Sequence, residues 1–301
     1  MSTLQMTRDT SNDSGTKPRR ITIKRIALYL VLLMALVYFL IPTYVMIVTA
    51  LKPIEEVRLG SMLALPQNPT LEPFYKAWFE ACTGANCTGM QVGFWNSVQM
   101  TIPTIFIMIA LGVLNGYVLS FWRVRWANWF LAATVVATFL PYQVMIYPLI
   151  RVMSSIGIHG TLAAAIIVHT VYHMPVLTLI FRNYFIGLPI EMFKAARIDG
   201  AGFWRTLFSV ILPMSLPIMI VAVILAVTWV WNDFLIGLTF AGQQNFPMMV
   251  QVNNIIGSDT AEKAYNVEMA AIFLTSIVPL AVYFLAGKWF VRGITSGAVK
   301  G

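Results

Sequence analysis

The chain has 301 residues, of which 58% are hydrophobic and 11% charged, and its formal net charge is +8. A soluble domain normally carries about 25% charged residues, so this composition excludes an ordinary soluble protein and predicts several apolar membrane spans. The positive charge does not indicate binding to nucleic acid, because the Lys and Arg residues lie in loops beside the apolar runs and form no basic face.

Residues 1–25 are predicted to form a polar and basic tail. The first 20 are rich in Ser, Thr and Asn, which is typical of a disordered segment. A cleaved signal peptide is the alternative, but its apolar core should be about 7 to 15 residues long. The apolar run over 26–51 is much longer and has no clear small-x-small cleavage site. It therefore predicts a retained first span.

Five further apolar runs have lengths close to the roughly 20 residues that cross the hydrocarbon core of a bilayer. They are continuous rather than alternating, which favours helices over the strands of a barrel. Prolines in or at the ends of these runs predict kinks. The sequence thus predicts an all-α membrane protein, a six-helix transmembrane bundle over 26–288, with spans near 26–51, 97–121, 127–150, 161–181, 207–231 and 267–288.

The Lys and Arg residues predict the orientation of this bundle. With the N-terminus in the cytoplasm, fifteen of the 20 basic residues fall in inside segments and five in outside loops. This asymmetry predicts that both termini are cytoplasmic. It also places the loop over 182–206 and the tail over 289–301 inside.

The long outside loop over 52–96 contains the two cysteines of the chain, Cys82 and Cys87. Their four-residue spacer contains Gly and Asn, and an extracytoplasmic location permits oxidation, so the pair is a candidate disulfide. Two inert thiols and a metal site are the alternatives.

The motifs of an enzyme are absent from the sequence. It has no Gly-x4-Gly-Lys-Ser/Thr phosphate loop, so this chain is not expected to hydrolyse ATP. His169 and His173 share a helix face, but no Cys, Asp or Glu lies near enough in sequence to complete a zinc site. We therefore predict no catalytic residue and no metal, and interpret the two histidines as a polar contact between helices.

A cluster of aromatic and polar residues lies at the outer end of the fifth span. Aromatic faces stack on the C–H surfaces of sugars, and amides or carboxylates bind hydroxyl groups, so the cluster is a candidate substrate path. An interfacial aromatic belt is the alternative. The next outside loop has a polar tip over 242–245 that either contacts a soluble partner or is simply solvated. The candidate path residues are Trp229, Trp231, Asn232 and Asp233.

The segment over 191–217, EMFKAARIDGAGFWRTLFSVILPMSLP, is polar and basic between two spans. Its first seven residues favour a helix, and Gly200 and Gly202 permit a sharp turn. Four aromatic side chains, Phe193, Phe203, Trp204 and Phe208, are ones that a partner cleft could enclose. An ordinary basic loop lying on anionic lipid is the alternative.

The order of residues in this segment resembles the EAA loop of the membrane subunits of ATP-binding-cassette importers. Ala195-Ala196 is followed after three residues by Gly200, and after nine more by Val210, Ile211, Leu212 and Pro213. Lys194 stands where that family usually has Glu. The resemblance implies a type I importer permease fold whose loop forms a coupling helix against the ATPase. The implied coupling residues are Glu191, Lys194, Ala195, Ala196, Asp199, Gly200, Ala201, Leu212 and Pro213.

The end of the chain, 290–301, resembles the tail of carbohydrate-class permeases of the maltose-transporter type, where the tail reaches the ATPase; a frayed terminus is the alternative.

The implied protein is the permease of an ATP-driven sugar importer in the bacterial inner membrane. Its implied partners are a second permease, two ATPase subunits that hold ATP and Mg²⁺, an extracytoplasmic sugar-binding protein and membrane lipid. Glucose or mannose is the expected substrate, with alpha-glucosides and glycerol-phosphate compounds as alternatives. A secondary transporter working without ATP would predict inverted repeats or a buried ionisable pair, and neither is evident.

Overall fold

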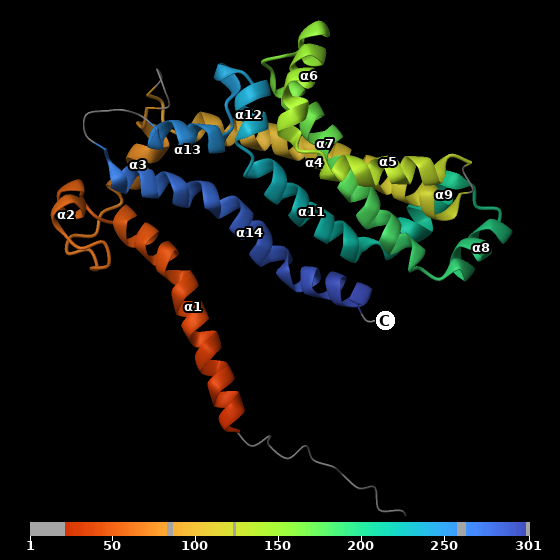
Figure 1. Ribbon diagram of the computed structural model, residues 1–301, viewed down its shortest axis with the longest axis horizontal. Coiled ribbons are helices and arrows are strands. Elements are labelled where there is room, and N and C mark those ends of the chain that lie inside the picture. The colour runs from red at the N-terminus through yellow and green to blue at the C-terminus, as the bar shows by residue number, and fades with distance from the viewer. Residues whose placement is uncertain (1–21, 83–86, 123–124, 258–262, 299–301) are drawn as a thin grey trace, which may run out of the picture. The chain divides into compact units, whose positions relative to one another are not determined.

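The computed structural model describes residues 22–82, 87–122, 125–257 and 263–298. Every regular element in these ranges is helical, which confirms the all-α prediction. Most of the predicted N-terminal tail, residues 1–21, lies outside the described residues, as do residues 299–301. The elements, shown in Figure 1, are α1 Ile23–Ala50, α2 Ile54–Leu59, α3 Glu72–Phe79, α4 Gln91–Phe121, α5 Ala127–Phe139, α6 Tyr142–Ser155, α7 Leu162–Ile186, α8 Ile190–Ile198, α9 Phe203–Thr206, a π-helical turn Leu207–Ile211, α10 Leu212–Met214, α11 Leu216–Trp231, α12 Leu235–Phe240, a 3₁₀ turn Gln243–Asn245, α13 Met248–Ile256 and α14 Tyr265–Ala298.

The chain divides into two units, residues 1–45 and 46–301. The first unit contains most of α1, an apolar helix of 28 residues with Pro42 inside it. The second unit contains all other helices and both clusters of buried hydrophobic residues. At its end, α14 continues as a helix to Ala298, beyond the limit at 288 that we predicted for the last span.

Four described helices, α1, α4, α7 and α14, are long and apolar enough to cross a membrane, and the number rises to six if two bent helix pairs each count as one span. One pair is α5 with α6, bent by 105°, and the other is the segment Phe203–Met214 with α11, bent by 79°. The predicted spans 127–150 and 207–231 fall on these pairs, so neither is one continuous helix. Pro141 at the first break and Pro217 beside the second lack the N–H that would continue a helix.

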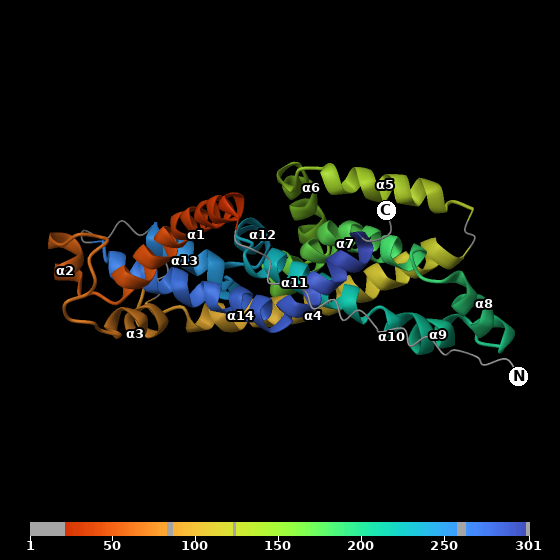
Figure 2. The same ribbon diagram turned by 90° about the horizontal axis from the view of Figure 1, so that it is seen from below.

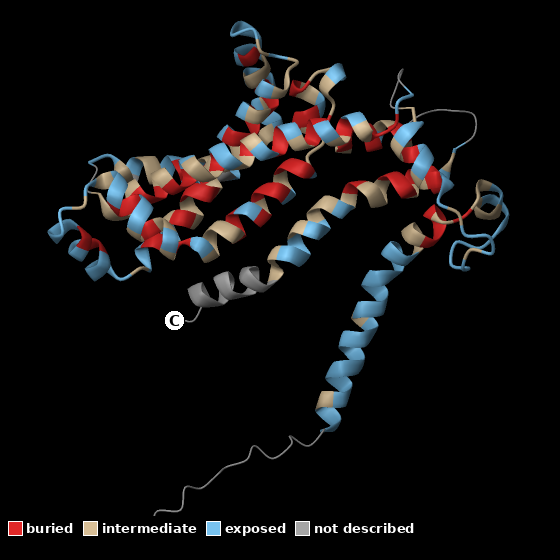
Figure 3. Cartoon of the chain, turned by 180° about the vertical axis from the view of Figure 1, so that it is seen from behind, coloured by how far each residue is buried: buried red, intermediate tan, exposed pale blue. Residues whose placement is uncertain are grey.

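The largest interface in the second unit is between α4 and α7. Gly112 and Gly116 of α4 lie against Leu177 and Phe181 of α7, and a Cβ at Gly116 would come within 2.8 Å of the Phe181 Cβ. Small residues four apart let two helix backbones approach closely in a membrane protein, where packing replaces the hydrophobic effect. Figure 3 shows buried residues concentrated where α4, α7 and α11 meet.

A second buried cluster joins α3, α11, α13 and α14. Phe74 of α3 packs edge-on against Phe273 of α14, with 5.8 Å between ring centroids. Figures 1 and 2 show α3 and α13 at the opposite end of the second unit from α8 and α9, and Figure 2 shows α5 running beside α7. The two ends of the unit are therefore separated by the length of α4.

Candidate functional site

The short helix α8 begins after Pro189 and ends in a glycine-dependent turn. The N–H of Gly200 donates to the carbonyl of Arg197 at 3.1 Å, and the N–H of Ala201 donates to the carbonyl of Ala196 at 2.9 Å. This pair of bonds is the Schellman arrangement, which needs a left-handed residue just after the helix. Gly200 has φ +77° and satisfies that need. Gly202 has an extended backbone with φ −76°, so only one of the two predicted turn glycines has this role.

The two faces of α8 differ in burial. Phe193 and Ala196 are buried, whereas Glu191, Lys194 and Ala195 are exposed. Residues three apart lie on the same helix face, so Phe193 and Ala196 hold α8 to the bundle. Of the implied coupling residues Ala195 and Ala196, only Ala195 is therefore exposed, and the side chain of Ala196 is buried.

Aromatic side chains attach the loop to the end of α4. Phe193 stacks on Phe121 with 4.7 Å between centroids and an interplanar angle of 13°. Phe203 packs on Tyr117 at 4.9 Å and on Trp122 at 5.2 Å. These contacts correct our interpretation of Phe193 and Phe203 as side chains offered to a partner, because Phe193 is buried and Phe203, which is half-buried, packs on α4.

The remaining predicted coupling residues lie on the same loop and on the turn that follows it. Asp199 is exposed at the end of α8, and Ala201 is half-buried. Leu212 is half-buried and Pro213 exposed, directly after the π-helical turn. The hydroxyl of Tyr184 on α7 donates to the carbonyl of Met214 at 2.8 Å. The segment that leaves the loop is thus bonded to α7, just as the loop itself is attached to α4.

Trp204 and Phe208 are exposed and stack on each other at 6.0 Å. With residues of α4 and α11 they line an apolar groove of about 560 Å³. Of the four aromatic residues in the loop, these two are the ones that remain free for contact with lipid or another chain.

The predicted substrate path divides into two parts. Trp231 is 2% exposed, and its Nε1 donates to the carbonyl of Thr275 at 2.9 Å. It is a packing residue between α11 and α14, so its assignment to the path is wrong. Residues two apart on a helix face different sides, and Trp229 accordingly faces α7, where its ring stacks on His173 with 5.1 Å between centroids.

The stack continues beyond Trp229 on α7 and α6. Tyr172 packs edge-on against His173 at 5.2 Å and against Tyr142 at 5.5 Å. We call Tyr142, Tyr172, His173 and Trp229 the aromatic strip. Each of the four is half-buried. The i, i+4 spacing of His169 and His173 was the available sequence signal for this strip. Tyr172 lies beside His173 on α7, but Tyr142 begins α6 directly after a break in the third span, which sequence reasoning placed inside one helix.

Asp233 lies next to the strip, after α11. Its Oδ2 accepts hydrogen bonds from the N–H groups of Ile236 at 2.8 Å and Gly237 at 3.0 Å, which starts α12. The same oxygen is 3.7 Å from Nε2 of His169, whose side chain is fully buried. Asn232 beside Asp233 is exposed.

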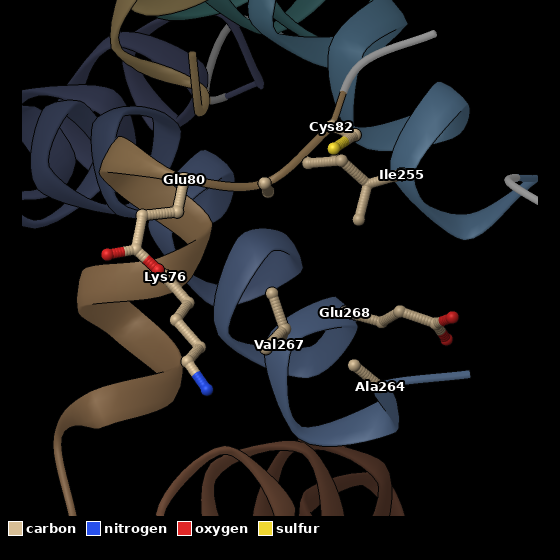
Figure 4. Close-up of a pocket in the computed structure, with 8 residues that line it drawn as sticks. Lys76, Glu80, Cys82, Ile255, Ala264, Val267 and Glu268 are labelled. Atoms are coloured by element: carbon tan, nitrogen blue, oxygen red, sulfur yellow. The ribbon is translucent and has the colours of Figure 1, made fainter. Parts of the chain in front are cut away.

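At the far end of the unit, Cys82 and Cys87 are joined by a disulfide bond. Cys82 lines a pocket of about 250 Å³ between α3, α13 and α14 (Figure 4). Lys76 and Glu80 come from the α3 side of this pocket, and Val267 and Glu268 from α14. Among the described residues no group of three or more His, Cys, Asp or Glu side chains could hold a metal ion.

A bundle of helices long and apolar enough to cross a membrane is the architecture of an integral membrane protein. The chain belongs to the family described as the inner membrane component of binding-protein-dependent transport systems, whose sequence pattern matches residues 89–296. It is therefore a multi-pass permease, and it has the type I fold of ATP-binding-cassette importers.

Individual relatives agree with this membership. The chain is 34% identical to a probable ABC transporter permease protein of Pyrococcus horikoshii over 94% of this chain and 100% of that one. It is 29% identical to a melibiose/raffinose/stachyose import permease protein of Bacillus subtilis, covering 92% of this chain and 97% of that one. The fold matches a chain of a bacterial ABC transporter involved in the import of the acidic polysaccharide alginate, with a TM-score of 0.77, 18% identity and coverage of 91% and 100%.

Proposed function

We propose that this chain is one of two different permeases in an ATP-driven importer of sugars, and that α8 is the helix through which the ATPase acts on it. The supporting observation is the construction of the loop. One face of α8 is buried, with Ala196 on it and Phe193 stacked on Phe121 of α4, while the other face, with Lys194 and Ala195, is exposed. A helix built in this way can receive a force on its outer face and pass it to the bundle.

The transmission route follows the contacts of the loop. Displacement of α8 acts on the end of α4 through Phe193 and Phe203, and on α7 through the bond from Tyr184 to Met214. Since α4 and α7 share the largest interface of the unit, the two helices move together. Closure of two ATPase subunits around ATP and Mg²⁺ would then tilt the bundle and open its path on the opposite side, as alternating access requires.

The proposed orientation places α8 and both termini in the cytoplasm. The asymmetry of Lys and Arg supports it, and so does the disulfide between Cys82 and Cys87 at the other end of the unit, because disulfides persist outside the cytoplasm. An extracytoplasmic binding protein would deliver the substrate at that end. The tail after residue 288 is proposed to contribute further contact with the ATPase.

The proposed substrate is a sugar, with the glucose or mannose group as our specific candidate. The Bacillus subtilis relative carries melibiose, raffinose and stachyose in its name. The stacked aromatic side chains on α6, α7 and α11 provide surfaces of the kind that sugars contact.

The test is to purify this chain with its companions and to reconstitute transport. Co-purification should recover a second permease and an ATPase, and vesicles that contain the complex should accumulate labelled sugar only with ATP and the binding protein. Accumulation that persists without ATP would instead support the secondary transporter.

A further inference from the structure

We propose that the aromatic strip and Asp233 form a saccharide-binding surface on this subunit, and that it selects uncharged sugars. The inference rests on the proposed function and specifies the substrate class and the contact residues. In the set of proposed sugar contacts, residues of α6 and α7 take the place of Trp231, which is buried.

The geometry of the strip suits a ring-shaped ligand. Trp229, His173 and Tyr172 follow one another at centroid distances of 5.1 and 5.2 Å, and Tyr142 extends the series by 5.5 Å. The rings of Trp229 and His173 are nearly parallel, with 16° between their planes. His173 lies between Trp229 and His169, whose ring stacks on it at 5.7 Å, so protein covers both of its faces. The accessible ring surface therefore comes from the other three residues, which are half-buried. Such a surface offers C–H stacking over more than one sugar unit.

The polarity of this face indicates that it meets water rather than lipid. Thr228 and Asn232 are exposed beside Trp229, and Asp233 and His173 lie within the same region. Polar and ionisable groups at membrane depth are costly when they face hydrocarbon, and normally face a cavity or another chain. The groove on the other side of α11, lined by Met219, Val223 and residues of α4, is entirely apolar by contrast. The helix α11 therefore has an apolar side, suited to contact with lipid, and a polar side.

Asp233 provides the polar partner for sugar hydroxyl groups. The two hydrogen bonds that it accepts from Ile236 and Gly237 both use Oδ2, which fixes the carboxylate and leaves Oδ1 to accept from a ligand. Behind it, His169 is fully buried, and neither ring nitrogen has a hydrogen-bond partner in the described part of the chain. Buried polar atoms without partners are rare and call for an explanation. Nε2 of His169 lies 3.7 Å from Oδ2 of Asp233. A small shift of the carboxylate when it binds a sugar hydroxyl would therefore give His169 a hydrogen-bond partner.

The charge of the site gives its selectivity. None of the described residues that form the strip or flank it, over 228–233, is Lys or Arg. The carboxyl of Asp233 is either neutral or negative and attracts no anion in either state. Phosphates and carboxylates are normally bound by Arg or Lys. The surface therefore fits neutral saccharides and excludes glycerol phosphate and uronic acids.

The experiment uses the complete reconstituted transporter with its binding protein in vesicles. Uptake and ATP hydrolysis are measured with glucose, mannose, maltose and melibiose, and with the anions sn-glycerol 3-phosphate and glucuronate. The variants are Trp229→Ala, Trp229→Phe and the matched control Trp129→Ala, since Trp129 is 81% exposed and lies on α5 away from the strip. As a second measurement, Asn232→Cys is labelled with a thiol reagent during turnover, with and without the sugar.

We expect transport of uncharged sugars only, a roughly tenfold loss of uptake in Trp229→Ala, as is typical when a stacking ring is removed, and near wild-type uptake in Trp229→Phe and Trp129→Ala. Sugar should also slow the labelling of Asn232→Cys. Transport of either anion, equal uptake by Trp229→Ala and Trp129→Ala at equal complex content, or labelling that sugar does not change would overturn the proposal. A wild-type complex that transports nothing with ATP would instead contradict the proposed function.

Discussion

The hydroxyl of Tyr117 donates a hydrogen bond to the carbonyl oxygen of Phe203 over 3.3 Å, which ties the start of α9 to α4. Tyr117 is fully buried and also contacts the ring of Phe203. One residue of the bundle thus holds the loop by both a polar and an apolar contact. We propose that Tyr117 thereby transmits movement of the loop to α4.

Tyr117→Phe should weaken coupling without preventing assembly. The variant keeps the ring packing and loses one hydrogen bond, which is typically worth about 1 kcal/mol. We expect a small decrease in the unfolding temperature of the purified complex and fewer sugars transported per ATP hydrolysed. Tyr147→Phe is the control, because Tyr147 is 70% exposed on α6. Identical transport ratios in the two variants would show that the bond has no role in coupling.

The disulfide between Cys82 and Cys87 is expected to contribute modestly to the free energy of unfolding. Cys82 and Cys87 are five positions apart, and closing so short a loop restricts the unfolded chain by about 2 kcal/mol. Non-reducing mass spectrometry should find the two peptides linked in protein from the membrane. Replacing both cysteines by serine should lower the unfolding temperature while uptake is retained, because Cys82 lies beside α3, α13 and α14 and not beside α8. Complete alkylation without reductant would reject the bond.

The proposed orientation can be measured with single cysteines in a background that lacks Cys82 and Cys87. Arg205 follows the loop glycines and is exposed, and Gln244 is exposed in the turn between α12 and α13. In intact cells an impermeant thiol reagent should label Gln244→Cys and leave Arg205→Cys unlabelled until the membrane is permeabilised. The reverse pattern, or labelling of both, would contradict cytoplasmic placement of the loop.

Much of the fold could be predicted because apolar length alone reports membrane spans. What failed depends on contacts between segments distant in sequence. Pro141 predicts a kink, but the 105° bend between α5 and α6 requires their packing on α7. The inward orientation of Phe193 likewise follows from Phe121 and Tyr117 on α4, which sequence order does not place beside it. The assignment of Trp231 was avoidable, since helical periodicity already places it on a different face from Trp229.

Lys194 is exposed on the outer face of α8, at the position where the EAA loop that this segment resembles has Glu. An ATPase surface that receives Lys should be acidic or neutral. Lys194→Glu is therefore expected to reduce the ATPase retained on the purified complex, by up to about 1 kcal/mol because an exposed pair is screened by solvent. Lys194→Gln should show an intermediate loss, and high salt should diminish both differences. Tighter retention by Lys194→Glu would indicate a basic partner surface.

Gly200→Val tests whether the turn after α8 sets the position of the coupling helix. Nothing lies within 4 Å of a Cβ added at this residue, so a side chain would meet no steric obstacle. Its backbone, however, has φ +77°, a conformation that costs an L-residue roughly 1 to 2 kcal/mol and a β-branched one more. The turn should open, release the two Schellman hydrogen bonds and reorient Ala195. We expect uptake to fall strongly while the ATPase remains partly bound and hydrolyses ATP without transport.

Gly202→Val is the matched control: its site is equally free of contacts, but its extended backbone accepts valine. Only a loss confined to Gly200→Val fits the proposed role. Wild-type uptake by this variant with the ATPase fully bound would show that α8 is not the coupling element.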